Sequence, residues 1–334
     1  MSAGRALRIA VVHTAPRVRE RFVEALRARL PGAEVIDWTG AASGMGTDAG
    51  AATQDDADYA VGWAPPADFF ARHPRLRAFF SAAAGVDHLL QHPGLPSVLP
   101  IVRLEDAGMA QQMLEYCLCE LLRLTLRRDD YAQRQAEARW DVLLPEKRSR
   151  WPVGVLGLGA LGAEVASGIA RFGYPVVGYS RTPKTIEGVR CFSAATGGAA
   201  GEDDALDAFL AATRVLIVMA PLTADTRDLL DARRLSRLQP GGYVINVARG
   251  PLVVDADLIA EIDRGHLAGA TLDVFREEPL PASHPFWRHP AIRITPHVAA
   301  LTLVGPSALQ IADKLERMHR GDPVSGLVDP ARGY

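Results

Sequence analysis

The chain has 334 residues, of which 48% are apolar and 23% are charged, and its net charge is −2. This length allows two domains, each with its own core. The net charge is close to zero and the sequence has no basic stripe, whereas proteins that bind nucleic acids or anionic membranes usually carry a basic patch. We therefore expect neither kind of partner. The three cysteines form neither a CxxC pair nor a metal knuckle, so we expect no disulfide framework, no metal site and a reducing, cytoplasmic location.

The first hundred residues alternate strand-like and helix-like patterns. β-branched runs predict short strands at 8–13, 34–38 and 59–63, and a periodic apolar pattern predicts a helix over 18–30. Residues 39–54 are mostly small or polar and predict a loop. Alternation of this kind predicts a parallel sheet covered by helices.

Residues 108 to about 140 carry a different pattern. Apolar residues recur at helical spacing through Leu122, and the pattern continues into a charged segment. We expect a long helical region that bridges domains or subunits.

Strand–helix alternation starts again at Val153 and predicts a second α/β unit. The strand-like segments are VGVL, VVGYS, VLIVMAP, YVINVA, GATLDV and IRIT, with helices at 164–172 and 256–264 between them. About six strands in this order are typical of a doubly wound parallel sheet. A final helix is predicted at 306–320, and residues 195–201 read as a small Ala/Gly insertion.

A glycine motif, Gly157-x-Gly159-x-x-Gly162, follows the strand at Val153 and opens a helix. The first glycine permits a tight turn, the second lets backbone approach a pyrophosphate, and the third lets helix and strand pack closely. The helix N-terminus supplies N–H groups and a positive dipole end for phosphates. The motif predicts a dinucleotide site, against the alternative of a plain strand–turn–helix.

The residues after the next strand indicate which dinucleotide is bound. A carboxylate at this position would accept the ribose 2′-hydroxyl of NAD, but the chain has Ser180, Arg181, Thr182 and Lys184 instead. Two hydroxyls and two cations suit a 2′-phosphate, which arginine can grip bidentately. We expect NADP(H), with NAD(H) bound more weakly, unless this is only a solvated basic loop.

Three polar residues stand at the ends of later strands. They are Arg249 in NVARG, Glu278 in LDVFREEPLP and His297 in ITPHVAA. Open α/β sheets bind ligands at the carboxyl ends of their strands. Physical reasoning alone does not choose between Glu277 and Glu278.

Several segments together resemble the D-isomer-specific 2-hydroxyacid dehydrogenase family, and within it the glyoxylate/hydroxypyruvate reductase A type. The resemblance covers nearly the whole chain. It is carried by AAAGVD at 82–87, RLEDAGM at 103–109, the glycine motif, APLTADT at 220–226, NVARG, LDVFREEPLP, ITPHVAA and ARGY at 331–334.

The resemblance implies a role for each polar residue. His297 would be the acid/base, and Glu278 rather than Glu277 would pair with it and favour the imidazolium. Arg249 would bind the 2-oxo acid and polarise its carbonyl. Backbone N–H groups of Ala83, Ala84 and Gly85 would hold the substrate carboxylate, and Trp63 would form a pocket wall. The further cofactor contacts would be Ala160, Leu161, Ala220, Pro221, Val247, Ala248 and Asp273, the last on the nicotinamide side.

These inferences predict two Rossmann-like α/β domains with a cleft that closes and excludes water. Residues 1–106 with 297–334 would form the substrate domain, and 107–296 the dinucleotide-binding domain. The predicted activity is NADPH-dependent reduction of a small 2-oxo acid, such as glyoxylate or hydroxypyruvate, to the D-2-hydroxy acid, in a homodimer. Two alternatives remain: a non-catalytic NAD(P)H-sensing scaffold of the corepressor type, and a dehydrogenase of another small anion such as formate or phosphite.

Overall fold

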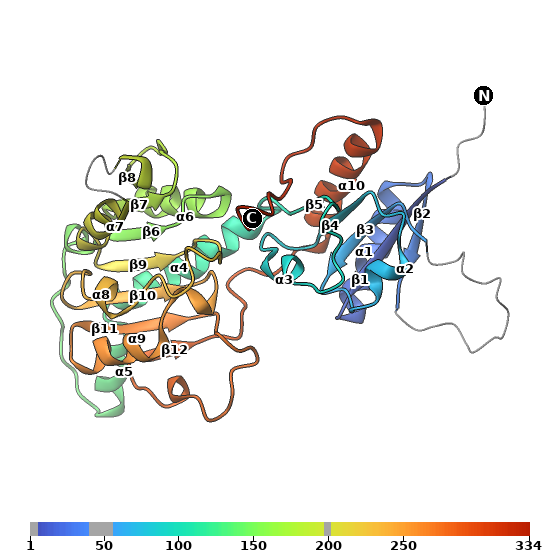
Figure 1. Cartoon of the computed structure of the whole chain (residues 1–334). Coiled ribbons are helices and arrows are strands. Elements are labelled where there is room, and N and C mark those ends of the chain that lie inside the picture. Colours follow the sequence, from blue (N-terminus) through green and yellow to red (C-terminus); the bar gives the residue numbers. More distant parts are fainter. Residues whose placement is uncertain (1–5, 40–55, 197–201) are drawn as a thin grey trace. The chain divides into compact units, whose positions relative to one another are not determined.

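A computed structural model describes residues 6–39, 56–196 and 202–334, so most of the loop predicted at 39–54 and of the insertion at 195–201 lies outside the described residues. The chain forms two compact units (Figure 1). Unit 1 comprises Met1–Gly108 and Thr302–Tyr334, and unit 2 comprises Met109–Leu301. Residues 297–301 thus belong to unit 2, whereas the sequence placed them with the first domain. The physical reason is that the amides of residues 297–299 hydrogen-bond to Asp273 of unit 2.

Unit 1 is built on a parallel sheet. Within its described residues, five strands lie in the order β2-β1-β3-β4-β5. The strands are β1 (Leu7–His13), β2 (Ala33–Asp37), β3 (Tyr59–Trp63), β4 (Ala78–Ser81) and β5 (Ile101–Val102). Alternate residues of β1 face opposite sides, and because Ile9 to Val12 are all buried, both faces of the sheet are covered.

In the described part of unit 1, four helices cover the sheet. They are α1 (Pro16–Arg29), α2 (Phe69–Arg72), α3 (Asp87–Leu90) and α10 (Val304–Arg320). Helices α1 and α10 pack against each other, while α2 and α3 contribute Phe69, Phe70 and Leu89 to a cluster with Ala10 and Val12 of β1. The C-terminal helix therefore completes the N-terminal unit.

Unit 2 is built on a larger parallel sheet. Its described residues form seven strands in the order β12-β11-β10-β9-β6-β7-β8. The strands are β6 (Val153–Leu156), β7 (Val176–Ser180), β8 (Val189–Ser193), β9 (Val215–Val218), β10 (Gly242–Asn246), β11 (Leu267–Leu272) and β12 (Ile292–Ile294). The predicted fold class, α/β with two doubly wound parallel sheets, is confirmed.

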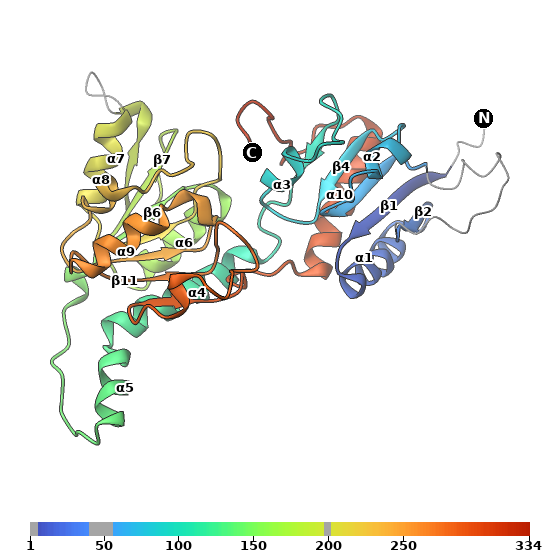
Figure 2. The same cartoon turned by 60° about the horizontal axis from the view of Figure 1, so that its bottom comes forward.

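Helices cover both faces of this second sheet (Figures 1 and 2). One core cluster includes residues of α4 and α6 and the other includes residues of α7, α8 and α9. The helices that cover the sheet are α4 (Met109–Thr125), α6 (Ala160–Arg171), α7 (Glu202–Ala211), α8 (Ala232–Leu235) and α9 (Asp255–Asp263). A further helix, α5 (Arg128–Ala136), has no buried residue. Short 3-10 turns lie at Arg148–Arg150, Ala194–Thr196, Gly250–Leu252 and Pro285–Trp287. Within the described ranges, no helix is long and apolar enough to cross a membrane.

The structure differs from the sequence expectations at two places in unit 2. The predicted long helical region over 108–140 is two helices, because the chain turns at Arg127, whose φ of 55° is left-handed. The seventh strand, β8, was not predicted. It lies at the edge of the sheet, and its sequence, VRCFS, mixes apolar with polar residues and is mostly not buried, so it lacks the apolar run that identified the other strands.

Candidate active site

The glycine motif forms a tight turn between β6 and α6. Gly157 has a φ of +106°, and a Cβ on it would lie 2.6 Å from the amide nitrogen of Ala220. A Cβ on Gly162 would lie 1.9 Å from the carbonyl oxygen of Gly157, so this glycine lets α6 approach the strand. A Cβ on Gly159 would meet nothing within 4 Å. The open space at Gly159 and the N-terminus of α6 beside it fit a pyrophosphate.

The basic loop follows β7, the neighbour of β6. Ser180 ends the strand, and its Oγ donates a hydrogen bond of 2.7 Å to the carbonyl of Thr182. Arg181, Thr182 and Lys184 are exposed. This arrangement turns a short cationic loop toward solvent beside the glycine turn, and its donor groups fit a 2′-phosphate.

The other predicted cofactor contacts lie at the same edge of the sheet. Ala160 and Leu161 begin α6. Ala220 and Pro221 follow β9, and Val247 and Ala248 follow β10. Because β6, β9 and β10 are parallel neighbours, the structure brings these residues together around the glycine turn.

Arg249 is held by the turn that follows β10. The buried Asn246 binds both sides of this turn, since its Nδ2 donates to the Arg249 carbonyl at 2.9 Å and its Oδ1 accepts from the Ala248 amide at 3.1 Å. A Cβ on Gly250 would lie 2.0 Å from the Phe275 carbonyl carbon. Glycine at this position therefore lets the Arg249 turn pack directly on the segment that leads to Glu278.

Glu278 and His297 form a hydrogen-bonded pair. Oε2 of Glu278 lies 2.8 Å from Nδ1 of His297, and Oε1 accepts from the Phe275 amide at 2.9 Å. The contact with the imidazole is thus made by Glu278, although Glu277 and Glu278 are both exposed. With Nδ1–H donating to the carboxylate, Nε2 is the ring nitrogen that gains or loses a proton.

Electrostatics favour the ionised form of Glu278. Burial raises the pKa of this carboxyl, but hydrogen bonds from His297 and Phe275 and the charges of His297 and Arg249 outweigh burial and hold the pKa below its ordinary value. A lowered carboxyl pKa contributes stability that is present above its unfolded-state pKa and is lost as pH falls through the folded-state pKa. The Glu278 carboxylate therefore stays ionised at neutral pH.

Asp273 holds the turn that carries His297. This side chain is 1% exposed. Its Oδ1 accepts from the Val298 amide at 2.8 Å, its Oδ2 accepts from the Ala299 amide at 2.9 Å, and its carbonyl accepts from the His297 amide at 2.8 Å. His297 has a φ of 55°, a left-handed conformation that costs a non-glycine residue about 1–2 kcal/mol. The three amide contacts to Asp273 offset this cost.

The predicted substrate residues of unit 1 lie at the carboxyl ends of two adjacent strands. Trp63 is the last residue of β3, and its ring lies 3.6 Å from that of His88, centroid to centroid. Ala83, Ala84 and Gly85 form a bend after β4. The Ala83 amide donates to Ser81 Oγ at 3.2 Å, which leaves the amides of Ala84 and Gly85 as the better candidates for an anion.

Sequence reasoning missed one part of the site. Thr295, two residues before His297, donates to Asp273 Oδ1 at 2.6 Å and contacts Tyr116 of α4 at 2.7 Å. The position of Thr295 within ITPHVAA is a signal that could have been used, but nothing in the sequence links it to Tyr116, 179 residues away.

Comparison with known proteins identifies the family. A family model described as the D-isomer specific 2-hydroxyacid dehydrogenase, NAD binding domain, matches residues 118–299. Glyoxylate/hydroxypyruvate reductase A of Yersinia enterocolitica is 40% identical over 94% of this chain and 96% of its own length. The protein of the same name from Serratia proteamaculans is 41% identical, with the same coverage.

Solved structures agree with this assignment. A D-isomer specific 2-hydroxyacid dehydrogenase from Xanthobacter autotrophicus, in complex with NADPH and MES, is 40% identical with a TM-score of 0.86 and covers 98% of this chain and 100% of that one. An NADPH-dependent glyoxylate/hydroxypyruvate reductase from Sinorhizobium meliloti, in complex with NADP and sulfate, is 34% identical with the same TM-score and coverage. This chain therefore belongs to the D-isomer specific 2-hydroxyacid dehydrogenase family.

Proposed function

We propose that this protein reduces a small 2-oxo acid of the glyoxylate/hydroxypyruvate class to the D-2-hydroxy acid, with NADPH as hydride donor. The observation that carries the proposal is the 2.8 Å pair of Glu278 and His297 in the same unit as the glycine turn and the basic loop. The names of the relatives support the substrate class and the cofactor.

The reaction needs a hydride at the carbonyl carbon and a proton at the carbonyl oxygen. When bound, NADPH supplies the hydride. His297 donates the proton from Nε2, and Glu278 orients the ring and stabilises the imidazolium from which the proton leaves. Arg249 binds the substrate carboxylate and polarises the carbonyl group as negative charge develops on its oxygen.

Unit 1 supplies the remaining substrate contacts in this proposal. We assign the substrate carboxylate to the backbone amides of the 83–85 bend, with Ala84 and Gly85 as the principal donors because the Ala83 amide already binds Ser81. Trp63 provides an apolar wall.

A substrate panel tests the proposal directly. We expect glyoxylate or hydroxypyruvate to oxidise NADPH, which is measured as a decrease in NADPH absorbance. We expect no reduction of NADP with formate or phosphite. In His297→Asn the rate should fall by about 10²–10⁴-fold, the usual contribution of general acid catalysis. Turnover of formate or phosphite would identify the other dehydrogenase class. No turnover in either direction would favour the dinucleotide-sensing scaffold.

The basic loop predicts the cofactor preference. In Arg181→Gln, the dissociation constant for NADPH should rise about tenfold while that for NADH changes less than about twofold, because a hydrogen bond to a charged group contributes about 1.5–3 kcal/mol. Arg171→Gln, an exposed arginine at the end of α6, is the control and should leave both constants unchanged. Equal affinities of the unaltered protein for the two cofactors would refute the assignment.

The adjacent glutamates offer a matched pair for the acid/base assignment. Glu278→Gln should lower kcat at least about tenfold, because it removes the charge that stabilises the imidazolium. Glu277→Gln makes the same change in charge one residue away and should retain the wild-type rate. Steady-state kinetics of both variants tests this assignment, and equal losses of kcat would mean that Glu278 has no special role.

We also propose that the protein is a cytoplasmic homodimer that assembles through α4, α5 and the segment after them. None of the residues of α5 is buried, and the helix extends away from the sheet of unit 2 (Figure 2). Trp140, Val142 and Leu144 follow it and are 99%, 83% and 82% exposed. Exposed apolar side chains in a row are typical of an interaction surface, and three thiols without a disulfide suit a reducing compartment.

A single charge on this segment tests the dimer. Val142→Asp should convert the dimer to a monomer in light scattering coupled to size exclusion, because a buried unpaired carboxylate opposes association. Val98→Asp, an equally drastic change at a valine of unit 1 that is 87% exposed, should leave the dimer intact. A monomeric unaltered protein would contradict the proposal.

A further inference from the structure

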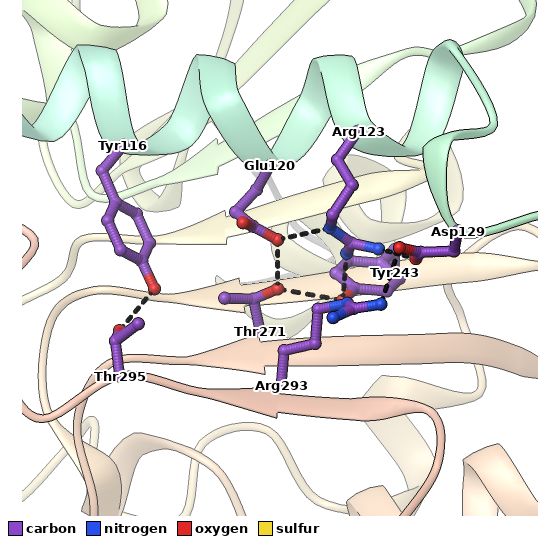
Figure 3. Close-up of polar contacts among 8 residues, drawn as sticks. All are labelled: Tyr116, Glu120, Arg123, Asp129, Tyr243, Thr271, Arg293 and Thr295. Atoms are coloured by element: carbon purple, nitrogen blue, oxygen red, sulfur yellow. Dashed lines mark hydrogen bonds and ion pairs between the residues drawn. The ribbon is translucent and has the colours of Figure 1, made fainter. Parts of the chain in front are cut away.

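The His297 turn is connected to α4 by a chain of side-chain hydrogen bonds. The Tyr116 hydroxyl lies 2.7 Å from Thr295 Oγ1, and Thr295 Oγ1 lies 2.6 Å from Asp273 Oδ1. Figure 3 shows Tyr116 reaching from α4 to Thr295, at the end of β12. Asp273 in turn binds the amides of residues 297–299. One chain of contacts therefore leads from α4 to the backbone of His297.

The direction of each hydrogen bond follows from the available protons. An ionised carboxylate only accepts, and a hydroxyl has a single proton. The Thr295 hydroxyl donates that proton to Asp273, so it can only accept from Tyr116, whose phenol is the donor. Burial raises the pKa of the Tyr116 phenol, so that it keeps its proton. The three groups form one directed series, and each member fixes the orientation of the next.

The helix at the start of this series is itself fixed to the sheet. One turn after Tyr116, Glu120 accepts from Thr271 Oγ1 at 2.7 Å and from Arg123 at 2.9 Å (Figure 3). Arg123 donates to the Tyr243 hydroxyl at 2.7 Å. These bonds join α4 to β10 and β11, so the Tyr116 hydroxyl starts from a rigid position.

We propose that Tyr116 and Thr295 are positioning residues, which orient Asp273 and thereby hold His297 where it transfers the proton. The proposal rests on the acid/base role proposed for His297. Neither residue touches the reacting atoms in this account. Their effect passes through the carboxylate of Asp273, whose two oxygens must face the Val298 and Ala299 amides for the left-handed turn at His297 to persist.

The chain offers a matched control on the same helix. Thr125 of α4 and Tyr174 form another pair of threonine and tyrosine hydroxyls, which is buried and 2.9 Å apart, and neither residue is part of the series that leads to His297. Tyr116→Phe and Tyr174→Phe thus each remove one tyrosine–threonine hydrogen bond in which one partner belongs to α4. Thr295→Val removes the hydroxyl at nearly constant side-chain volume, and Thr295→Ser keeps the hydroxyl but lacks the methyl group.

Two measurements test the proposal in the full-length protein. The first is kcat with the best 2-oxo acid, together with the primary isotope effect from deuterated NADPH. In Tyr116→Phe and Thr295→Val, kcat should fall about tenfold, since misplacing a catalytic group by a fraction of an ångström is costly, and the isotope effect should rise as chemistry becomes rate-limiting. Thr295→Ser should recover at least about half the wild-type rate, and Tyr174→Phe should keep both values.

The second measurement is hydrogen–deuterium exchange of the segment with the Val298 and Ala299 amides, which requires no activity. Exchange there should speed up in Tyr116→Phe and Thr295→Val and stay unchanged in Tyr174→Phe and Thr295→Ser. Equal behaviour of the two tyrosine variants, or failure of serine to rescue, would overturn the proposal. Absence of turnover in the unaltered protein would instead count against the proposed function, and the exchange result would still decide whether the series holds the turn.

Discussion

The buried carboxylate of Asp273 is the constraint on which the site depends. Removing a carboxylate from water costs several kcal/mol unless hydrogen-bond donors replace the water. Here the donors are the Thr295 hydroxyl and the amides of Val298 and Ala299. Because these donors come from the segment after β12, satisfying the charge of Asp273 fixes the path of that segment. His297 lies within it, and its position is a consequence of solvating one buried charge.

The register of the parallel sheet brings these groups to one level. Leu272 of β11 is opposite Ile294 of β12, so Asp273 and Thr295 follow their strands at the same height. Asn246 ends β10 opposite Leu272, and the Arg249 turn follows it. Gly250 then packs on the Phe275 backbone, close to Glu278. Neighbouring strands that end at the same level therefore place an arginine, a glutamate and a histidine at one edge of the sheet.

The sequence predicted those parts of the structure that depend on local patterns. The six strands with apolar runs, the glycine turn and the strand ends with Arg249, Glu278 and His297 all follow from short segments. The break at Arg127 was not predictable, because no glycine or proline marks its left-handed backbone. The edge strand β8 has no apolar run. The link from Tyr116 to Thr295 joins residues far apart in the chain, and only the docking of α4 on the sheet creates it.

The strand order also places the basic loop, which we propose to select the cofactor, apart from the residues that we propose for catalysis. The basic loop follows β7, the glycine turn follows β6, and Arg249 follows β10, on the other side of β6. Three interstrand spacings of about 4.8 Å, or roughly 14 Å, separate β7 from β10. If the basic loop binds the 2′-phosphate, as proposed above, a dinucleotide with its pyrophosphate at the glycine turn would have its adenosine end toward β7 and its nicotinamide end toward β10 and β11. This orientation would bring the hydride to the side of the sheet edge that carries His297, because β10, β11 and β12 are consecutive neighbours there.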